Sequence, residues 1–162
     1  MKDKMSIIGI GFKLALLTLT YTALIVLFSH YSKLDVRIHF ISYSFLFIIG
    51  AILIIVGVSF LIISIITLNK AYKADTLRIS GVYSVCRHPL YSSWIILIVP
   101  GIVLLLDSWI SLTIPIVMYV IFRVLIKQEE LFLQNKFGEE YIDYKSKVSL
   151  LFPMFWRYEK NK

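Results

Sequence analysis

Charged residues and cysteine are scarce in this chain of 162 residues, and each shortage excludes a class of protein. Only 17% of the residues are charged while 59% are hydrophobic, and a soluble domain of this length cannot bury so much apolar surface. The single cysteine, Cys86, cannot form an intramolecular disulfide, which excludes a disulfide scaffold. The composition therefore excludes a soluble globule and a disordered chain, and it predicts a single membrane domain over residues 1–162.

Two widespread kinds of site are also missing. Gly9-Ile10-Gly11 is the single G-x-G pattern, and Leu14 stands where the third glycine of a dinucleotide-binding loop would be. His30 and His39 are nine residues apart with no cysteine or acidic cluster beside them, so no metal site is predicted.

Four apolar runs are long enough to cross a bilayer as helices, which takes roughly 20 residues. They cover residues 7–28, 38–68, 89–106 and 109–126. The second run exceeds the thickness of the hydrocarbon core, so it must tilt, project into the cytosol or bend near Gly50 or Gly57. The expected fold is an all-α integral membrane protein with four transmembrane helices.

The third and fourth runs form the expected C-terminal helical hairpin. Only Asp107 and Ser108 separate them, so the two helices must lie antiparallel. Pro100 and Pro115 each remove a backbone hydrogen bond in mid-span and favour a kink. Kinked neighbours can leave a cavity between them.

Residues 127–162 are expected to form a short cytoplasmic amphipathic tail. Residues 128–136 continue the fourth helix, Gly138 breaks it, and residues 139–147 form a short polar helix. The apolar segment at residues 148–156 is too short to cross, so it should lie along the inner interface or fold back over the bundle.

Lysine and arginine are distributed unevenly over the connecting segments. Outside the spans, thirteen of them fall on one side and only Lys33 and Arg37 on the other. The positive-inside rule therefore places both termini and the loop at residues 69–88 in the cytoplasm of a cell whose plasma (inner) membrane holds the protein. The net charge of +7 then needs no nucleic acid as partner, and membrane lipids are the expected surroundings.

Two polar clusters lie at the cytoplasmic ends of the hairpin. Since its two helices have equal length, the start of one and the end of the other lie at the same depth. The residues expected to be neighbours are Arg87, His88 and Tyr91 on one side and Arg123, Lys127, Glu129 and Glu130 on the other.

Each residue also has an ordinary structural interpretation. Pro89 suits the first turn of a helix, Arg87 and Lys127 suit the positive-inside rule, and a glutamate pair suits a solvated helix face. A functional role is favoured because these residues gather in one place. A histidine, arginines, tyrosines and two carboxylates at a membrane boundary raise the free energy of the protein unless they pair with one another or take part in binding or catalysis.

The spacing of these residues resembles a known family. The ordered elements are Gly81-x-Tyr83-x-x-x-Arg87-His88-Pro89-x-Tyr91, then Glu129-Glu130, then Phe137-Gly138-x-Glu140-Tyr141-x-x-Tyr144, followed by Val148 and Pro153. This set resembles the isoprenylcysteine carboxyl methyltransferase family and its phospholipid methyltransferase relatives, over nearly half of the chain.

The resemblance implies an integral membrane enzyme that transfers a methyl group from S-adenosylmethionine in a cytosol-facing pocket. It implies cofactor contacts at His88, Pro89, Tyr91, Glu129 and Glu130, with Tyr83 and Tyr141 as wall residues. It further implies a role for Arg87 in substrate orientation or catalysis, and His88 is the second catalytic candidate. Relatives often carry arginine two residues before the paired glutamates, where this chain has Lys127, so Lys127 or Arg123 would orient the substrate.

The acceptor is left open by the residues. A carboxylate is already ionised, whereas a phenol, thiol or amine must lose a proton, for which His88 is the natural base. A lipophilic or lipid-modified substrate would enter laterally from the inner leaflet. The alternatives are a phospholipid headgroup N-methyltransferase and a non-catalytic membrane scaffold that retains the fold.

Overall fold

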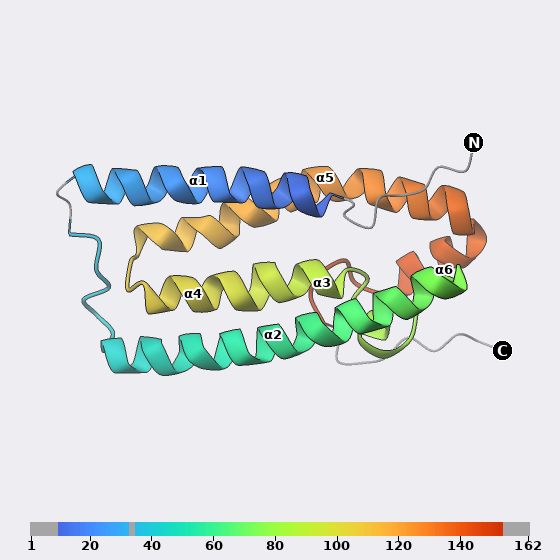
Figure 1. The fold of residues 1–162 in the computed structure, drawn as a ribbon, viewed down its shortest axis with the longest axis horizontal. Coiled ribbons are helices and arrows are strands. Elements are labelled where there is room, and N and C mark those ends of the chain that lie inside the picture. Colours follow the sequence, from blue (N-terminus) through green and yellow to red (C-terminus); the bar gives the residue numbers. More distant parts are fainter. Residues whose placement is uncertain (1–9, 33–34, 154–162) are drawn as a thin grey trace.

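A computed structural model describes residues 10–32 and 35–153, and their regular structure is helical (Figure 1). In chain order the elements are α1 (Gly11–Tyr31), α2 (Tyr43–Ala74), η1 (Gly81–Ser84), α3 (Pro89–Ser92), η2 (Ser93–Ile98), α4 (Val99–Leu105), η3 (Ile110–Leu112), α5 (Thr113–Phe137) and α6 (Glu139–Lys147). Within these ranges the one β feature is an isolated bridge between Arg37 and Ser108. The all-α prediction is confirmed.

Three helices in the described part are long and apolar enough to cross a membrane: Gly11–Tyr31, Tyr43–Ala71 and Ile110–Phe137. The third predicted span appears as a shorter apolar helix, Pro89–Leu105, built from α3, η2 and α4. Large apolar side chains are exposed along α1, α2 and α5, as expected for helices in contact with lipid. The exact number of crossings stays a prediction.

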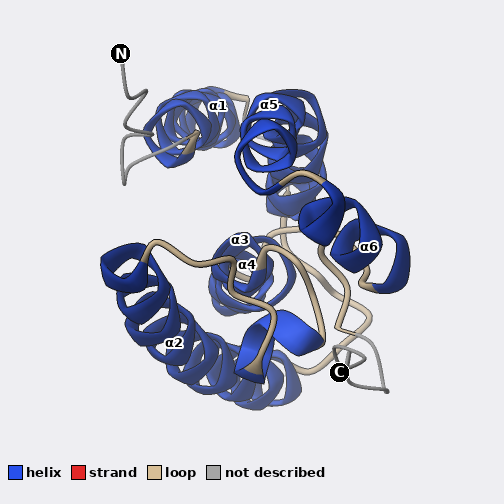
Figure 2. Ribbon diagram, turned by 90° about the vertical axis from the view of Figure 1, so that its right-hand side faces the viewer, coloured by secondary structure: helices blue, strands red, loops and turns tan. Residues whose placement is uncertain are grey.

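The helices form two groups around the central hairpin helix. In Figure 2, which looks along the bundle, α1 lies beside α5, and α2 lies on the other side against α3 and α4. At the end of the bundle that holds the hairpin turn, the N–H of Trp109 donates to the carbonyl of Val36 at 2.9 Å, and its indole N–H donates to the carbonyl of Asp35 at 3.4 Å. These bonds join the loop between α1 and α2 to the turn of the hairpin.

Small side chains recur every seven residues along the buried face of α2. They are Gly50, Gly57, Ser64 and Ala71, which a seven-residue spacing keeps on nearly one face of a helix. A Cβ on Gly50 would lie 2.8 Å from the carbonyl oxygen of Gly101 in α4. The α-helix runs through Gly50 and Gly57 without interruption, so these glycines serve close packing of α2 on α4.

The helix around Pro100 widens into a π-helical segment, Ser93–Ile98. The N–H of Val99 donates to the carbonyl of Trp94, five residues earlier. Because Pro100 has no N–H, the regular ladder cannot continue through it, and a π-bulge is one way to accommodate the gap. The sequence predicted this disturbance as a kink.

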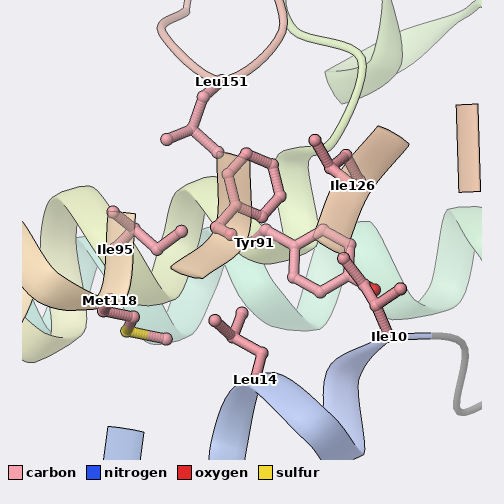
Figure 3. Close-up of a cluster of buried hydrophobic side chains, with 8 residues drawn as sticks. Ile10, Leu14, Tyr91, Ile95, Met118, Ile126 and Leu151 are labelled. Carbon is pink, nitrogen blue, oxygen red and sulfur yellow. The ribbon is translucent and has the colours of Figure 1, made fainter. Parts of the chain in front are cut away.

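The C-terminal segment folds back over the start of the hairpin. The break at Gly138, where φ is +55°, and the helix at residues 139–147 are both confirmed. After α6, Leu151 joins a core built from α1, the hairpin helices and this segment, as Figure 3 shows. The predicted segment at residues 148–156 therefore folds back over the bundle as far as residue 153, and its remainder lies outside the described residues.

Candidate active site

The loop that leads into α3 is held by the C-terminal segment. The backbone N–H of Arg87 donates to the carbonyl of Ser149 at 2.9 Å, and that of His88 donates to Leu150 at 3.2 Å. His88 takes the N-cap position of α3 and Pro89 the first turn, where the missing N–H of proline costs nothing. The backbone of Arg87 and His88 is thereby fixed at the open end of the hairpin, where α3 begins.

Glu130 of α5 is the centre of a cluster of charged and polar side chains. Its Oε1 pairs with the guanidinium of Arg87 and accepts a hydrogen bond from the Tyr141 hydroxyl at 3.3 Å. Its Oε2 lies 3.1 Å from the Nζ of Lys145. The side chains of Arg87 and Glu130 are only 10% and 12% exposed, so this charge pair lies largely out of solvent. Two cations and a hydroxyl thus surround one carboxylate.

Glu129 has fewer partners than Glu130. Its Oε2 accepts a hydrogen bond from the Tyr91 hydroxyl at 3.0 Å, and its Oε1 lies 3.6 Å from Nδ1 of His88. The other ring nitrogen of His88, Nε2, lies 3.7 Å from Glu130, which is too long for a hydrogen bond. The imidazole therefore stands between the two carboxylates.

Two buried nitrogen atoms of this cluster have no hydrogen-bond partner among the described residues. They are Nε of Arg87 and Nε2 of His88. Buried polar atoms are nearly always paired, so each such atom in a native protein needs an explanation. These two unpartnered nitrogens lie beside Glu129, whose carboxylate has one hydrogen bond at 3.0 Å, and such a combination suits a ligand-binding site.

Aromatic rings line the cluster on both sides. The Tyr91 ring packs on Phe122 with centroids 5.3 Å apart, and the His88 ring lies 6.0 Å from Tyr91. The Tyr144 hydroxyl donates to the carbonyl of Tyr83 at 2.5 Å, which connects α6 to the loop. Burial raises the pKa of the Tyr83, Tyr141 and Tyr144 hydroxyls, so at neutral pH they stay protonated donors.

Most of the predicted site residues are brought together, and two are not. Arg87, His88, Tyr91, Glu129, Glu130 and Tyr141 share the cluster, with Pro89 and Tyr83 in its supporting loop. Arg123 and Lys127 are exposed on α5, seven and three residues before Glu130, and in the described structure neither pairs with a carboxylate. Their role in orienting a substrate stays a prediction.

Lys145 is a member of the cluster that sequence reasoning missed. It lies four residues after Tyr141 in α6, so the two side chains project from the same face of that helix. The sequence therefore did contain a signal for Lys145, because a residue one helical turn after Tyr141 projects from the same face of the helix. Lys145 supplies the second positive charge on Glu130.

Comparison with known proteins identifies the family of the chain. The model of the isoprenylcysteine carboxyl methyltransferase (ICMT) family matches residues 43–135, more than half of the chain. A protein-S-isoprenylcysteine O-methyltransferase of Mus musculus is 37% identical over 81 residues, which are 49% of this chain and 29% of that protein. The protein of that name from Homo sapiens is 34% identical over 80 residues, 49% of this chain and 28% of that protein.

A probable protein-S-isoprenylcysteine O-methyltransferase of Oryza sativa subsp. indica is 29% identical over 116 residues, which are 65% of this chain and 60% of that protein. The chain thus spans less than a third of the length of the mammalian relatives it matches. No solved structure matches it significantly. The family match includes the loop with Arg87 and His88 and the glutamate pair of α5, and the chain belongs to the isoprenylcysteine carboxyl methyltransferase family.

Proposed function

We propose that this chain is a membrane methyltransferase that uses S-adenosylmethionine to methylate a lipophilic acceptor of the isoprenylcysteine kind. The observation that carries the proposal is the cluster in which Arg87 and His88 meet the two adjacent glutamates of α5. Relatives that carry the name protein-S-isoprenylcysteine O-methyltransferase support the choice of acceptor.

The proposed topology has four crossings, with Pro89–Leu105 as the third. Both termini and the cluster would face the cytoplasm across the inner membrane. The support is the excess of lysine and arginine in alternate connecting segments, thirteen against two. A lipophilic acceptor could then approach laterally from the inner leaflet.

The residues of the cluster fit the proposed cofactor. S-adenosylmethionine carries a carboxylate, an ammonium, a sulfonium cation and an adenine ring. The unpartnered Nε of Arg87 suits its carboxylate, and the tyrosine rings suit its cationic and aromatic parts. The family relationship and the donor set therefore point to the same ligand.

The two glutamates should have different roles. Glu130 is already surrounded by Arg87, Lys145 and the Tyr141 hydroxyl, whereas Glu129 has one hydrogen bond at 3.0 Å and a longer approach to His88. Glu129 is thus the carboxylate with capacity for an ammonium group. Glu130 would hold the guanidinium of Arg87 in a fixed position at the open end of the hairpin.

The chemistry needed from the chain is mainly alignment. When bound, the cofactor supplies a methyl group on a positively charged sulfur to a nucleophile. Arg87 would orient an anionic acceptor, and a carboxylate would need no base because it is already ionised. A phenol or thiol would have to lose a proton, and His88 would accept it. His88 is 5% exposed and its ring packs near Tyr91 and Phe122, which would keep bulk water away from it.

Binding of S-adenosylmethionine to the full chain in detergent, measured by calorimetry, tests the proposal. We expect saturable binding that Glu129→Gln weakens at least about tenfold, a loss of about 1.4 kcal/mol. Glu139→Gln is the matched control, because Glu139 is an exposed glutamate of α6. No binding by folded wild-type chain would contradict the methyltransferase assignment, and equal loss in both variants would contradict the role of Glu129.

Acceptor screening tests the second half of the proposal. Turnover of N-acetyl-S-farnesylcysteine with full loss in Arg87→Gln supports an isoprenylcysteine carboxylate as acceptor. Methylation of phosphatidylethanolamine instead would show that the chain is a phospholipid headgroup N-methyltransferase. Binding of the cofactor without turnover of any carboxylate, phenol, thiol or amine would favour a non-catalytic scaffold.

A further inference from the structure

Two cations of α5 outside the cluster form a stripe with a tyrosine. Tyr119, Arg123 and Lys127 follow one another at four-residue intervals, so their side chains share one side of the helix. Nη1 of Arg123 donates to the Tyr119 hydroxyl at 3.2 Å, and its Cζ lies 5.9 Å from the centre of the Tyr119 ring. The guanidinium is therefore held in a defined position on an exposed surface.

The surroundings of this stripe are apolar. Val124, between the two cations, is 64% exposed, and Leu131, one turn beyond Lys127, is 59% exposed. Exposed aliphatic residues on a helix long enough to cross a membrane are expected to contact lipid. Arg123 and Lys127 thus lie beside side chains that contact the bilayer.

Neither cation has a carboxylate partner in the described part of the chain. The nearest acidic residues in sequence, Glu129 and Glu130, direct their carboxylates to the cluster formed with Arg87, Tyr91 and Lys145. A positive charge at the edge of the hydrocarbon region is costly unless something neutralises it. The neutralising group must therefore come from outside these residues, and the membrane is the adjacent source of anions.

We propose that Arg123 and Lys127 bind the phosphate of an anionic phospholipid, with the Tyr119 hydroxyl fixing the guanidinium. A guanidinium offers two parallel donors to a phosphate, and an ammonium one turn away adds a point charge. The apolar neighbours Val124 and Leu131 suit the acyl chains of the same lipid. This site uses none of the residues of the methyl-transfer cluster and does not depend on the activity proposed above.

The choice of a phospholipid over a free phosphate follows from these neighbours. A soluble anion would gain nothing from exposed aliphatic side chains on both sides of the cations. The choice over the carboxylate of an acceptor follows from distance along the helix, because Arg123 lies seven residues, about 10 Å, before Glu130, where the unpartnered nitrogens of Arg87 and His88 are available to that carboxylate.

The test is binding of a fluorescent short-chain phosphatidylglycerol to the full chain in uncharged detergent, followed by fluorescence anisotropy. We expect Arg123→Gln with Lys127→Gln to raise Kd at least about tenfold, and Tyr119→Phe to raise it about two- to fivefold. The matched control is Lys70→Gln with Lys73→Gln, which removes two exposed cations from the end of α2 and leaves the stripe intact. The control should retain the wild-type Kd.

Three results would overturn the proposal. Equal weakening in both double variants would mean that only total charge matters. Displacement by inorganic phosphate at the concentration where unlabelled phosphatidylglycerol competes would mean that the site takes a free anion. Displacement by N-acetyl-S-farnesylcysteine at that concentration would mean that the cations serve the acceptor. Competition by phosphatidylglycerol but not by phosphatidylcholine is the expected result.

Discussion

The contact between α2 and α4 allows a quantitative prediction for Gly101→Ala. A Cβ on Gly101 would lie 2.8 Å from the carbonyl oxygen of Gly50 and 3.2 Å from the backbone nitrogen of Ile54. Carbon atoms in good contact lie about 3.5–4.0 Å from their neighbours, and backbone atoms inside a helix cannot rotate away. The two helices must therefore separate along the whole seam.

Overpacking of this kind costs about 1–3 kcal/mol, and the better helix propensity of alanine returns up to about 1 kcal/mol. The expected net loss is about 1–2 kcal/mol, which lowers the melting temperature by about 2–8 °C for a chain of this size. Gly11→Ala is the control, because a Cβ there would meet no atom within 4 Å. That variant should melt at or slightly above the wild-type temperature.

The assay can use the chain's own cysteine. Cys86 is the single thiol and is buried, so a thiol-reactive fluorescent dye reports unfolding without further labelling. Since Gly50→Ala strains the same contact, the double variant Gly50→Ala with Gly101→Ala should lose less than the sum of the single losses. If Gly101→Ala melted together with Gly11→Ala, the assigned close packing of α2 on α4 would be refuted.

Three further predictions follow from individual residues. Burial raises the pKa of the Cys86 thiol to about 12, so Ellman's reagent at pH 8 should label the folded chain far more slowly than the denatured chain; comparable rates would contradict its burial. Tyr144→Phe leaves the carbonyl of Tyr83 without its donor and should cost about 1–3 kcal/mol in thermal unfolding, whereas Tyr31→Phe, at an exposed position, should cost nothing. Gly138→Ala forces a side chain into φ +55°, ψ −131° and should destabilise by about 1–3 kcal/mol in the same assay, and a neutral result would argue against this turn between α5 and α6.

Sequence reasoning gave the helical class, the hairpin and the meeting of its two polar ends. Apolar runs of roughly 20 residues are long enough to cross a membrane as helices. The two-residue connection at Asp107 and Ser108 is so short that the two adjoining helices must lie antiparallel. Because the start of one hairpin helix and the end of the other lie at the same depth, Arg87 and His88 were predicted to lie beside the glutamates of α5, and these contacts are present.

Equal depth predicted the neighbours of the glutamates only to within a turn or two of helix. Arg123 lies seven residues before Glu130, which puts the two on nearly the same side of α5 but about 10 Å apart along it, and its guanidinium lies over the Tyr119 ring. Small residues on α2 likewise indicate a packing face only once a partner such as Gly101 is in place. The rotation of each helix is set by packing between distant segments.

The amino-acid sequence by itself determined that the chain is a helical membrane protein with a polar site at one end of a hairpin, because hydropathy and turn length are local properties. Only the tertiary structure decided that Glu130 pairs with Arg87 and Lys145, while Glu129 accepts a hydrogen bond from the Tyr91 hydroxyl. This difference between the two glutamates depends on where α6 and the segment after it pack against the bundle. That packing is stabilised by contacts between residues far apart in the chain.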